Sequence, residues 1–301
     1  MEPAVTNPAA RPLRTVELVV DAKASLGEGP LWSVKAGRLY WLDIYARQIH
    51  CTDPADGSDR WVEVPGLPGA LVERSAGGFA IASEHGFGAI ELERGTIDPW
   101  CDPEVDLSGN RFNDGKVDAA GRFWAGTMSK QAPHAGQAGL YRLDPDRRVQ
   151  KMLSRVSISN GLAWSADGRT LYYIDTPTDE IAAFPVDPVT GGLGQRRVAI
   201  RKGGQPGWFD GMCIDAEGAL WVGHWAGHCL TRWDPIRGEL LEKIEFPVPN
   251  VTSCCFGGER LDTLFVTTAS DGADVVRHPL AGGLFRIQVG GIGLPSIPFA
   301  G

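Results

Sequence analysis

The sequence of 301 residues lacks a dense set of cysteines, a long apolar run and an excess of positive charge. Its six cysteines show no C-x-x-C spacing, so we expect buried free thiols and no disulfide scaffold. No run approaches the ~20 apolar residues of a membrane helix, and residues 1–14 lack the apolar centre of a signal peptide. With 29 Lys and Arg against 37 Asp and Glu, the net charge of −8 offers no basic field for nucleic acid or an anionic membrane. We therefore expect neither partner, and predict a cytoplasmic protein with a flexible tail at residues 1–14.

Turn-forming and aromatic residues are abundant, with 39 Gly, 21 Pro, 10 Trp, 11 Phe and 5 Tyr. One short apolar phrase recurs six times after a glycine or turn. The copies are GRLYWLD (37–43), GGFAIAS (77–83), GRFWAGT (121–127), GRTLYYIDT (168–176), GALWVGH (218–224) and RLDTLFVTT (260–268). Corresponding residues of successive copies lie 40 to 49 residues apart, which is the period of propeller blades and too long for most helical arrays. The repeat therefore indicates strands, since each phrase is too short for a helix.

A second apolar segment follows most copies and ends in a charged or Asp-Pro turn, so each unit reads as a hairpin. Six such units account for the whole length, which predicts an all-β, six-bladed β-propeller formed by residues 15–301 as a single domain. TVELVV (15–20) and GLFRIQV (283–289) are expected to share one blade and close the ring, because open end blades would expose strand edges. Tryptophans at repeat positions are expected to pack between blades. These are Trp32, Trp41, Trp124, Trp164 and Trp221.

Four segments upstream of the repeated phrase share an acid or amide followed by glycine. They are Glu28-Gly29, Asp114-Gly115, Asn160-Gly161 and Asp210-Gly211. Equivalent positions in propeller blades face the central axis, so these four oxygen-bearing side chains are expected to converge there. A divalent cation would offset the repulsion among the carboxylates, and oxygen ligands suit Ca, Mg or Mn, with Zn also possible. Asp-Gly and Asn-Gly are also ordinary turn signals, so spacing alone leaves the metal site and the turn as alternatives.

The segment 110–116, NRFNDGK, is denser in polar groups than a simple turn requires. Arg111 offers a planar fork for ligand oxygens, and Asn113 offers both a donor and an acceptor, although a solvated loop would account for them as well. Other chemistry is poorly supported, since no G-x-S-x-G elbow or P-loop is present. His224 and His228 stand four apart in strand-like sequence, where they would not share a helix face, so zinc ligation by them is not expected.

At these residues the sequence resembles the SMP-30/gluconolactonase/luciferin-regenerating-enzyme (regucalcin-like) family. The resemblance runs from about Thr15 to Gly301. It is carried by LGEGPLW (26–32), NRFNDGKVDAAGRFWAGTM (110–128), ISNGLAWS (158–165), DGMCIDAEGALWV (210–222), TSCCFGG (252–258) and AGGLFRI (281–287). Six ordered matches of this length are highly specific.

The resemblance implies a six-bladed propeller with one divalent metal ion (Ca, Zn, Mn or Mg) on its axis, held by Glu28, Asn160 and Asp210. It also implies hydrolysis of sugar lactones, with Arg111 and Asn113 contacting the sugar and Asp210 acting as catalytic base. By the same pattern Asp114 lies near the metal without being a direct ligand. It is therefore expected to be one of the substrate-binding residues.

One loop departs from the family pattern. After the GTM of the motif, the animal members carry acidic residues over the pocket, one of which contacts substrate, whereas this chain reads SKQAPH (129–134). Gln131 is therefore predicted to contact substrate, and an amide or cation in this loop would change which hydroxyls are recognised. The reaction class carries over from the family, but the choice of sugar does not.

We accordingly expect hydrolysis of aldono-1,4- and 1,5-lactones such as gluconolactone, with the metal polarising the carbonyl and Asp210 activating water. A promiscuous metal-dependent esterase or phosphotriesterase is the nearest alternative, and a non-catalytic calcium-binding propeller is the alternative from another class. The expected assembly is a monomer or a weak homo-oligomer.

Overall fold

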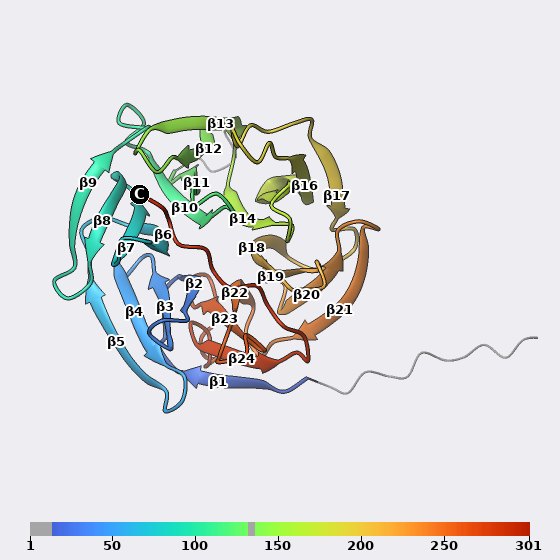
Figure 1. The fold of residues 1–301 in the computed structure, drawn as a ribbon. Helices are drawn as coiled ribbons and strands as arrows, with labels where there is room; N and C mark the ends of the chain where they lie inside the picture. Colours follow the sequence, from blue (N-terminus) through green and yellow to red (C-terminus); the bar gives the residue numbers. More distant parts are fainter. Residues whose placement is uncertain (1–13, 132–135) are drawn as a thin grey trace, which may run out of the picture.

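Six four-stranded antiparallel sheets stand around a central axis in the computed structural model, which describes residues 14–131 and 136–301 (Figure 1). The all-β, six-bladed propeller expected from the repeat is confirmed. Within the described residues the helical structure is one 3₁₀ turn, η1 (Thr176–Thr178), and no helix there is long and apolar enough to cross a membrane. The predicted tail lies outside the described residues except for Arg14, whose Nε is 2.9 Å from Glu242 Oε1.

Five of the blades are built from consecutive strands, ordered from the axis outward. Blade 1 consists of β2 (Gly27–Ser33), β3 (Arg38–Asp43), β4 (Gln48–Asp53) and β5 (Ser58–Glu63). Blade 2 consists of β6 (Pro68–Glu73), β7 (Phe79–Ser83), β8 (Gly86–Glu91) and β9 (Thr96–Cys101). Blade 3 consists of β10 (Asn110–Val117), β11 (Phe123–Ser129), β12 (Ala138–Leu143) and β13 (Val149–Val156). Blade 4 consists of β14 (Ser159–Trp164), β15 (Thr170–Asp175), β16 (Glu180–Pro185) and β17 (Arg197–Arg201). Blade 5 consists of β18 (Trp208–Ile214), β19 (Leu220–Trp225), β20 (Cys229–Asp234) and β21 (Glu239–Glu245).

The sixth blade joins the two ends of the chain. It consists of β22 (Asn250–Gly257), β23 (Thr263–Ala269), β24 (Leu284–Gln288) and β1 (Val16–Val20). β1 pairs antiparallel with β24 as the outer strand, so the expected closure of the ring is confirmed. The six repeated phrases form the second strand of each blade, from β3 to β23.

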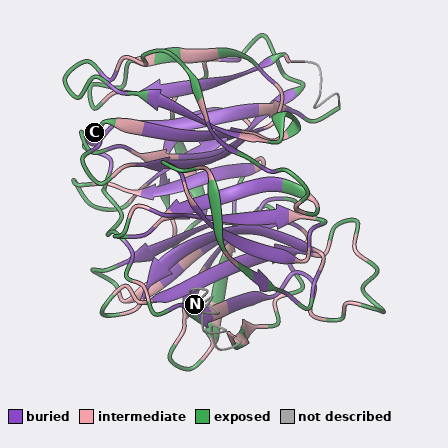
Figure 2. Cartoon of the chain, turned by 90° about the vertical axis from the view of Figure 1, so that its right-hand side faces the viewer, coloured by how far each residue is buried: buried purple, intermediate pink, exposed green. Residues whose placement is uncertain are grey.

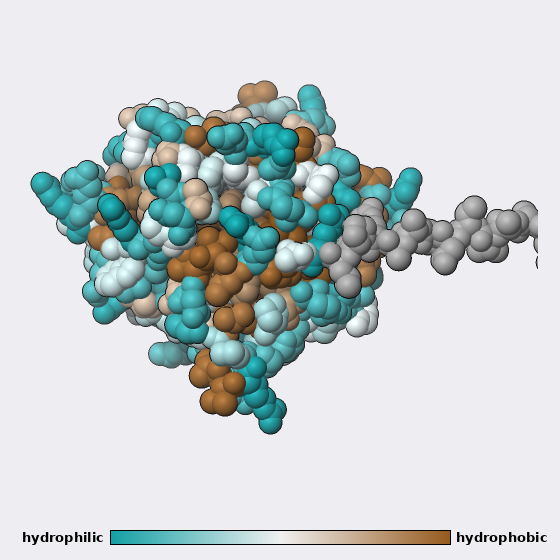
Figure 3. Space-filling model, turned by 90° about the horizontal axis from the view of Figure 1, so that it is seen from below, coloured by the Kyte–Doolittle hydropathy of each residue, from teal (hydrophilic) through white to brown (hydrophobic). Residues whose placement is uncertain are grey.

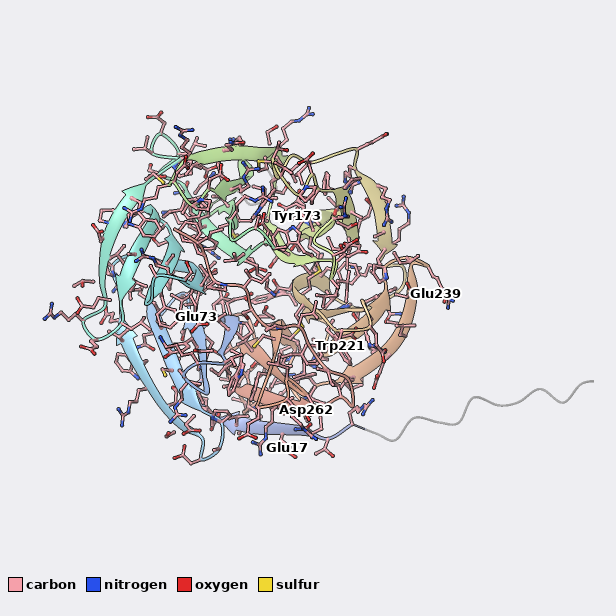
Figure 4. All side chains as sticks on the ribbon, in the orientation of Figure 1. Glu17, Glu73, Tyr173, Trp221, Glu239 and Asp262 are labelled. Carbon is pink, nitrogen blue, oxygen red and sulfur yellow. The ribbon has the colours of Figure 1, made fainter. Side chains whose placement is uncertain are left out.

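Packing follows the layers of each blade. The inner strands are mostly buried and the outer strands exposed, as the colours of Figure 2 show. In Figure 4, Glu17 on β1 and Glu239 on β21 lie at the rim, whereas Trp221 lies inside blade 5. The side of the ring that carries β1 is largely hydrophilic, with a few apolar groups gathered near its middle (Figure 3). Charged side chains buried within the blades are paired, as Arg122 is with Asp118 and Arg232 with Asp215.

Aromatic rings fill the spaces between blades. Trp124 of blade 3 lies edge-on to Trp164 of blade 4 at 5.8 Å, and Trp32 of blade 1 stacks on Phe265 of blade 6 at 5.8 Å. Trp221 likewise meets a phenylalanine of blade 6. The expected packing between blades is confirmed for these four tryptophans. Trp41 stacks on a histidine of its own blade and also belongs to a buried cluster with Phe265 and Leu284 of blade 6.

All six cysteines are free thiols, four of them buried and two half-buried. The expectation of free thiols is thus confirmed, and burial holds fully for four.

The last twelve residues cross one end of the ring, as the red trace in Figure 1 shows. Gly293 forms a bridge with Asp215 of blade 5, and Phe299 forms a parallel bridge with Arg74 of blade 2. The Phe299 ring is fully buried in the core between blades 2 and 3. This C-terminal strap (residues 290–301) therefore ties opposite parts of the ring together and covers one end of the axis.

Candidate active site

The pairing of the innermost strand with its neighbour shifts register in every blade. The shifts lie at Glu28/Leu31, Pro68/Ala70, Phe112/Gly115, Asn160/Leu162, Phe209/Met212 and Val251/Ser253. Such a bulge bends the strand and re-aims a side chain. All four acid-or-amide-glycine pairs fall at these shifts, inside strands β2, β10, β14 and β18. They are therefore strand bulges at the axis, and the alternative of simple turns is wrong.

At two of these bulges glycine is required because the next blade approaches closely. A Cβ on Gly161 would lie 2.8 Å from the Asp210 carbonyl oxygen, and one on Gly211 would lie 2.2 Å from Ser253 Oγ. The glycine N–H also turns back to the preceding carboxylate: Gly29 donates to Glu28 Oε2 at 2.9 Å. In each pair the acid or amide therefore supplies an oxygen that faces the axis. The glycine at positions 161 and 211 leaves room for the next blade.

The hub, defined here as Glu28, Arg111, Asp114, Asn160 and Asp210, brings these side chains together from blades 1, 3, 4 and 5. All are buried, with exposed fractions of 4% to 6%. Burial and the negative charges of Asp210 and Asp114 raise the pKa of Glu28 well above its usual value. Burial raises the pKa of Asp210 to about 8, even though a hydrogen bond from Asn160 favours its charged form. Carboxyl groups held this way repel one another and favour a proton or a cation.

Two hub oxygens have no hydrogen-bond partner among the residues that the structure describes. Asn160 donates from Nδ2 to Thr176 Oγ1 at 3.1 Å and also bonds Asp210, which leaves its buried Oδ1 unpartnered. Asp114 accepts from Gly115 N–H at 2.6 Å through Oδ1, and its Oδ2 is likewise unpartnered. Buried orphan oxygens are rare and call for an explanation such as an ion.

The residues present fit a hard divalent cation. Carboxylate and amide oxygens are ligands that Ca²⁺, Mg²⁺ and Mn²⁺ accept. Within residues 14–131 and 136–301, no three His, Cys, Asp or Glu side chains form a metal site by themselves, so the predicted set depends on the Asn160 amide. Glu28, Asn160 and Asp210 remain the predicted ligands.

Arg111 is the positive group of the hub. Its Nη1 donates to Asn113 Oδ1 at 2.7 Å and to Phe112 O at 2.9 Å, and the Tyr45 hydroxyl lies close enough to the guanidinium to interact with it. Asn113 in turn donates from Nδ2 to Ser159 O at 2.8 Å in blade 4. The predicted substrate-contacting pair is thus one linked unit, and Arg111 lies within electrostatic range of Glu28 and Asp210.

A cavity of about 190 Å³ extends along the axis, bordered by Gly29 and Asp114 near the hub and by residues 294–297 of the C-terminal strap at the far end. A second cavity of about 330 Å³ lies between blades 2 and 3, where Arg111 forms one wall and Glu84, His85 and Glu104 form others. The strap therefore covers the axis on the side away from the second cavity.

Gln131 is not part of this cluster. It is exposed at the end of a described segment, where its backbone N–H lies 3.3 Å from Ser129 Oγ. Residues 132–134 of the same predicted substrate loop lie outside the described residues. The assignment of Gln131 to substrate binding stays a prediction. His224, by contrast, uses both ring nitrogens on protein partners, Pro206 O and Thr231 Oγ1, each at 2.8 Å.

Two aspartates that position the site were missed by the sequence reasoning. Asp43 accepts from the backbone of Ser25 at 2.8 Å and Leu26 at 3.0 Å, just before Glu28. Asp175 accepts from the backbone of residues 157 and 158, just before Asn160. The signal was available, because both aspartates end a repeated phrase, YWLD and YYID.

Comparison with known proteins agrees with this geometry. The family model described as "SMP-30/Gluconolactonase/LRE-like region" matches residues 26–270. The chain belongs to this family. Relatives include regucalcin of Gallus gallus, 39% identical over 95% of this chain and 98% of its own length. A putative sugar lactone lactonase of Bacillus subtilis is 37% identical over 94% and 98%. Among solved structures, a regucalcin of Agrobacterium tumefaciens, described as a calcium-binding protein, superposes with a TM-score of 0.90 at 29% identity, covering 95% of this chain and 97% of its own.

Proposed function

We propose that this protein is a sugar lactone hydrolase that uses one divalent cation held by Glu28, Asn160 and Asp210. The observation that carries the proposal is the convergence at the axis of two buried carboxylates, an unpartnered amide oxygen and a guanidinium. Family membership supports it, since one relative is named a putative sugar lactone lactonase and another structure a calcium-binding protein. The chain's negative charge and lack of a basic field are consistent with a small-molecule substrate and with action in the cytoplasm.

The reaction class follows from what these groups can do. When bound, a divalent cation supplies Lewis-acid polarisation of a carbonyl and lowers the pKa of water. Asp210 accepts the proton of the attacking water, which is worth roughly 10²–10⁴-fold in rate. The water oxygen bonds to the lactone carbonyl carbon, the ring C–O bond breaks, and the departing alkoxide takes a proton to give the open hydroxy acid.

Arg111 and Asn113 orient the substrate in this scheme. The guanidinium presents several N–H donors in a fixed plane, of which Nη1 is already used on protein oxygens. Its other N–H groups are free of the bonds that Nη1 makes, and Arg111 lies within electrostatic range of Glu28 and Asp210, so it is the hub group suited to donate to hydroxyl or ring oxygens. Asn113 holds Arg111 in place and retains a second Nδ2 hydrogen for the substrate.

The test is hydrolysis of glucono-, galactono-, xylono- and arabinono-lactones in a pH-stat, with spontaneous opening subtracted. We expect chelator-treated protein to lose activity and to regain it with Ca²⁺, Mn²⁺, Mg²⁺ or Zn²⁺. Glu28→Gln should reduce the response to added metal, whereas Glu239→Gln on the outer strand should not. Activity that survives both chelation and Glu28→Gln would refute the metal-dependent mechanism.

A second candidate, a calcium-binding propeller without turnover, is favoured by the description of the Agrobacterium structure. It predicts calcium binding in calorimetry with no hydrolysis of any lactone or aryl ester. Comparing catalytic efficiency on sugar lactones and aryl esters distinguishes the lactonase from a promiscuous esterase.

A further inference from the structure

The turn between β3 and β4 places Tyr45 at the hub end of blade 1. Glu28 pairs with Leu42 and Gly27 pairs with Asp43, so residues 44–47 follow directly at the level where the hub begins. Tyr45 therefore lies on the side of the ring from which substrate reaches the hub, opposite the C-terminal strap.

The backbone on either side of Tyr45 is firmly held. Ile44 is fully buried and donates from its N–H to Leu26 O at 3.0 Å. Asp43 Oδ1 accepts from Ala46 N–H at 3.2 Å. The turn thus presents the tyrosine in a fixed position although its side chain is 47% exposed.

The exposed ring contacts a buried charge. The Tyr45 hydroxyl lies close enough to interact with the Arg111 guanidinium, which is only 4% exposed and belongs to blade 3. The hydrogen bonds that Arg111 donates from Nη1 go to atoms of its own strand, Phe112 O and Asn113 Oδ1. Tyr45 is therefore the contact that ties the guanidinium to blade 1, next to Glu28.

We propose that Tyr45 determines specificity for cyclic polyhydroxylated substrates. Its hydroxyl holds Arg111 in the orientation that binds substrate oxygens, and its exposed ring offers an apolar face to the C–H face of a sugar ring. Aromatic walls combined with a few fixed polar groups are the usual construction of small-molecule sites. This inference rests on the proposed lactone hydrolysis and adds the residue that selects among its substrates.

The experiment compares Tyr45→Phe and Tyr45→Ala with wild type on gluconolactone and on γ-butyrolactone, which has no hydroxyls. For gluconolactone, Tyr45→Phe should raise KM about three- to tenfold with kcat within about twofold, the size expected for one lost hydrogen bond to a charged group. Tyr45→Ala should raise KM further, to about thirtyfold. KM for γ-butyrolactone should change less than about twofold. Trp61→Ala, which removes another exposed ring from outer strand β5, is the matched control and should change neither substrate.

Equal losses on both substrates, or an unchanged KM for gluconolactone in Tyr45→Ala, would overturn the role of Tyr45. The proposed function fails separately, if wild type hydrolyses no lactone. In that case calorimetry with 1,5-anhydroglucitol, a cyclic polyol without a carbonyl, decides the matter. Binding by wild type that weakens in Tyr45→Ala supports the role of Tyr45, and no binding by wild type overturns it.

Discussion

Replacing Asp210 by Asn should stabilise the metal-free protein at pH 8 while abolishing its function. Burial is the main cause that raises the Asp210 pKa from 3.8 to about 8, so the folded chain binds this proton more tightly than the unfolded chain. An acid with a raised folded-state pKa loses stability as pH rises between the two values, here from about pH 4 to about pH 8. Asn removes that loss because it cannot ionise.

The magnitude follows from the shift. A rise from 3.8 to about 8 corresponds to about 6 kcal/mol at about 1.4 kcal/mol per pH unit. Water entry and local relaxation reduce the penalty of a buried charge, so we expect a gain of about 2 kcal/mol at pH 8. For a chain of this size that raises Tm by about 3 °C. At pH 5 the folded wild-type carboxyl is still neutral and only about a quarter of this loss has accrued, so the difference in Tm between the two proteins should shrink to about 1 °C.

Thermal unfolding of chelator-treated protein at pH 5 and pH 8 measures the effect, with Asp118→Asn as control. Asp118 is also buried, but it accepts from Arg122 Nε at 2.6 Å and Trp124 Nε1 at 2.8 Å. Asp118→Asn should therefore lower the free energy of unfolding by about 3 kcal/mol at both pH values. Added Ca²⁺ should stabilise wild type, by about 2.7 kcal/mol at a hundredfold excess over Kd, and should not stabilise Asp210→Asn. A Tm lower than that of wild type for metal-free Asp210→Asn at pH 8 would show that ionisation of Asp210 does not destabilise the folded protein.

Two further predictions concern the strap and the guanidinium. Phe299→Ala should lower the free energy of unfolding, measured by urea titration, by about 3–5 kcal/mol, because it empties a fully buried site. Ile297 lies in the same strap with 42% of its side chain exposed, so Ile297→Ala should lower the free energy of unfolding by under about 1 kcal/mol. An equal effect of the two substitutions would mean that the Phe299 side chain does not anchor the strap. Arg111→Lys keeps the charge but loses the planar fork that bonds Phe112 O and Asn113 Oδ1, so KM for sugar lactones should rise about tenfold with Tm within about 2 °C. A wild-type KM would show that charge alone is needed.

The fold could be predicted from the sequence because the repeated phrase coincides with one structural unit. Each copy is the second strand of a blade, buried on both sides, so its apolar residues recur at the blade period. Leu39, Leu171 and Leu264, each from a different copy of the phrase, are fully buried. The C-terminal strap had no such signal, because a single crossing made of isolated bridges leaves no periodic pattern.

The hub was partly predictable for the same reason. Glu28, Asn160 and Asp210 each precede a glycine and lie eight or nine residues before the glycine that opens the repeated phrase, because each falls at the bulge of its inner strand. The contact of Tyr45 with Arg111 was not predictable, since it joins two blades through side chains that follow no repeated pattern. Pairs of this kind depend on how blades 1 and 3 face each other across the axis, which only the closed ring determines.

The asymmetry of the hub has its origin in the two blades that contribute no free oxygen. Blade 2 has the same register shift, but the residue there is Pro68, whose ring carries no donor atom. Blade 6 has Thr252 at its shift, yet that hydroxyl lies 2.5 Å from Gly27 O and 2.9 Å from Thr267 Oγ1. All six inner strands therefore have the bulge. The side chain at the bulge decides whether a blade supplies an oxygen to the hub, as Glu28 does, or only packs against its neighbours.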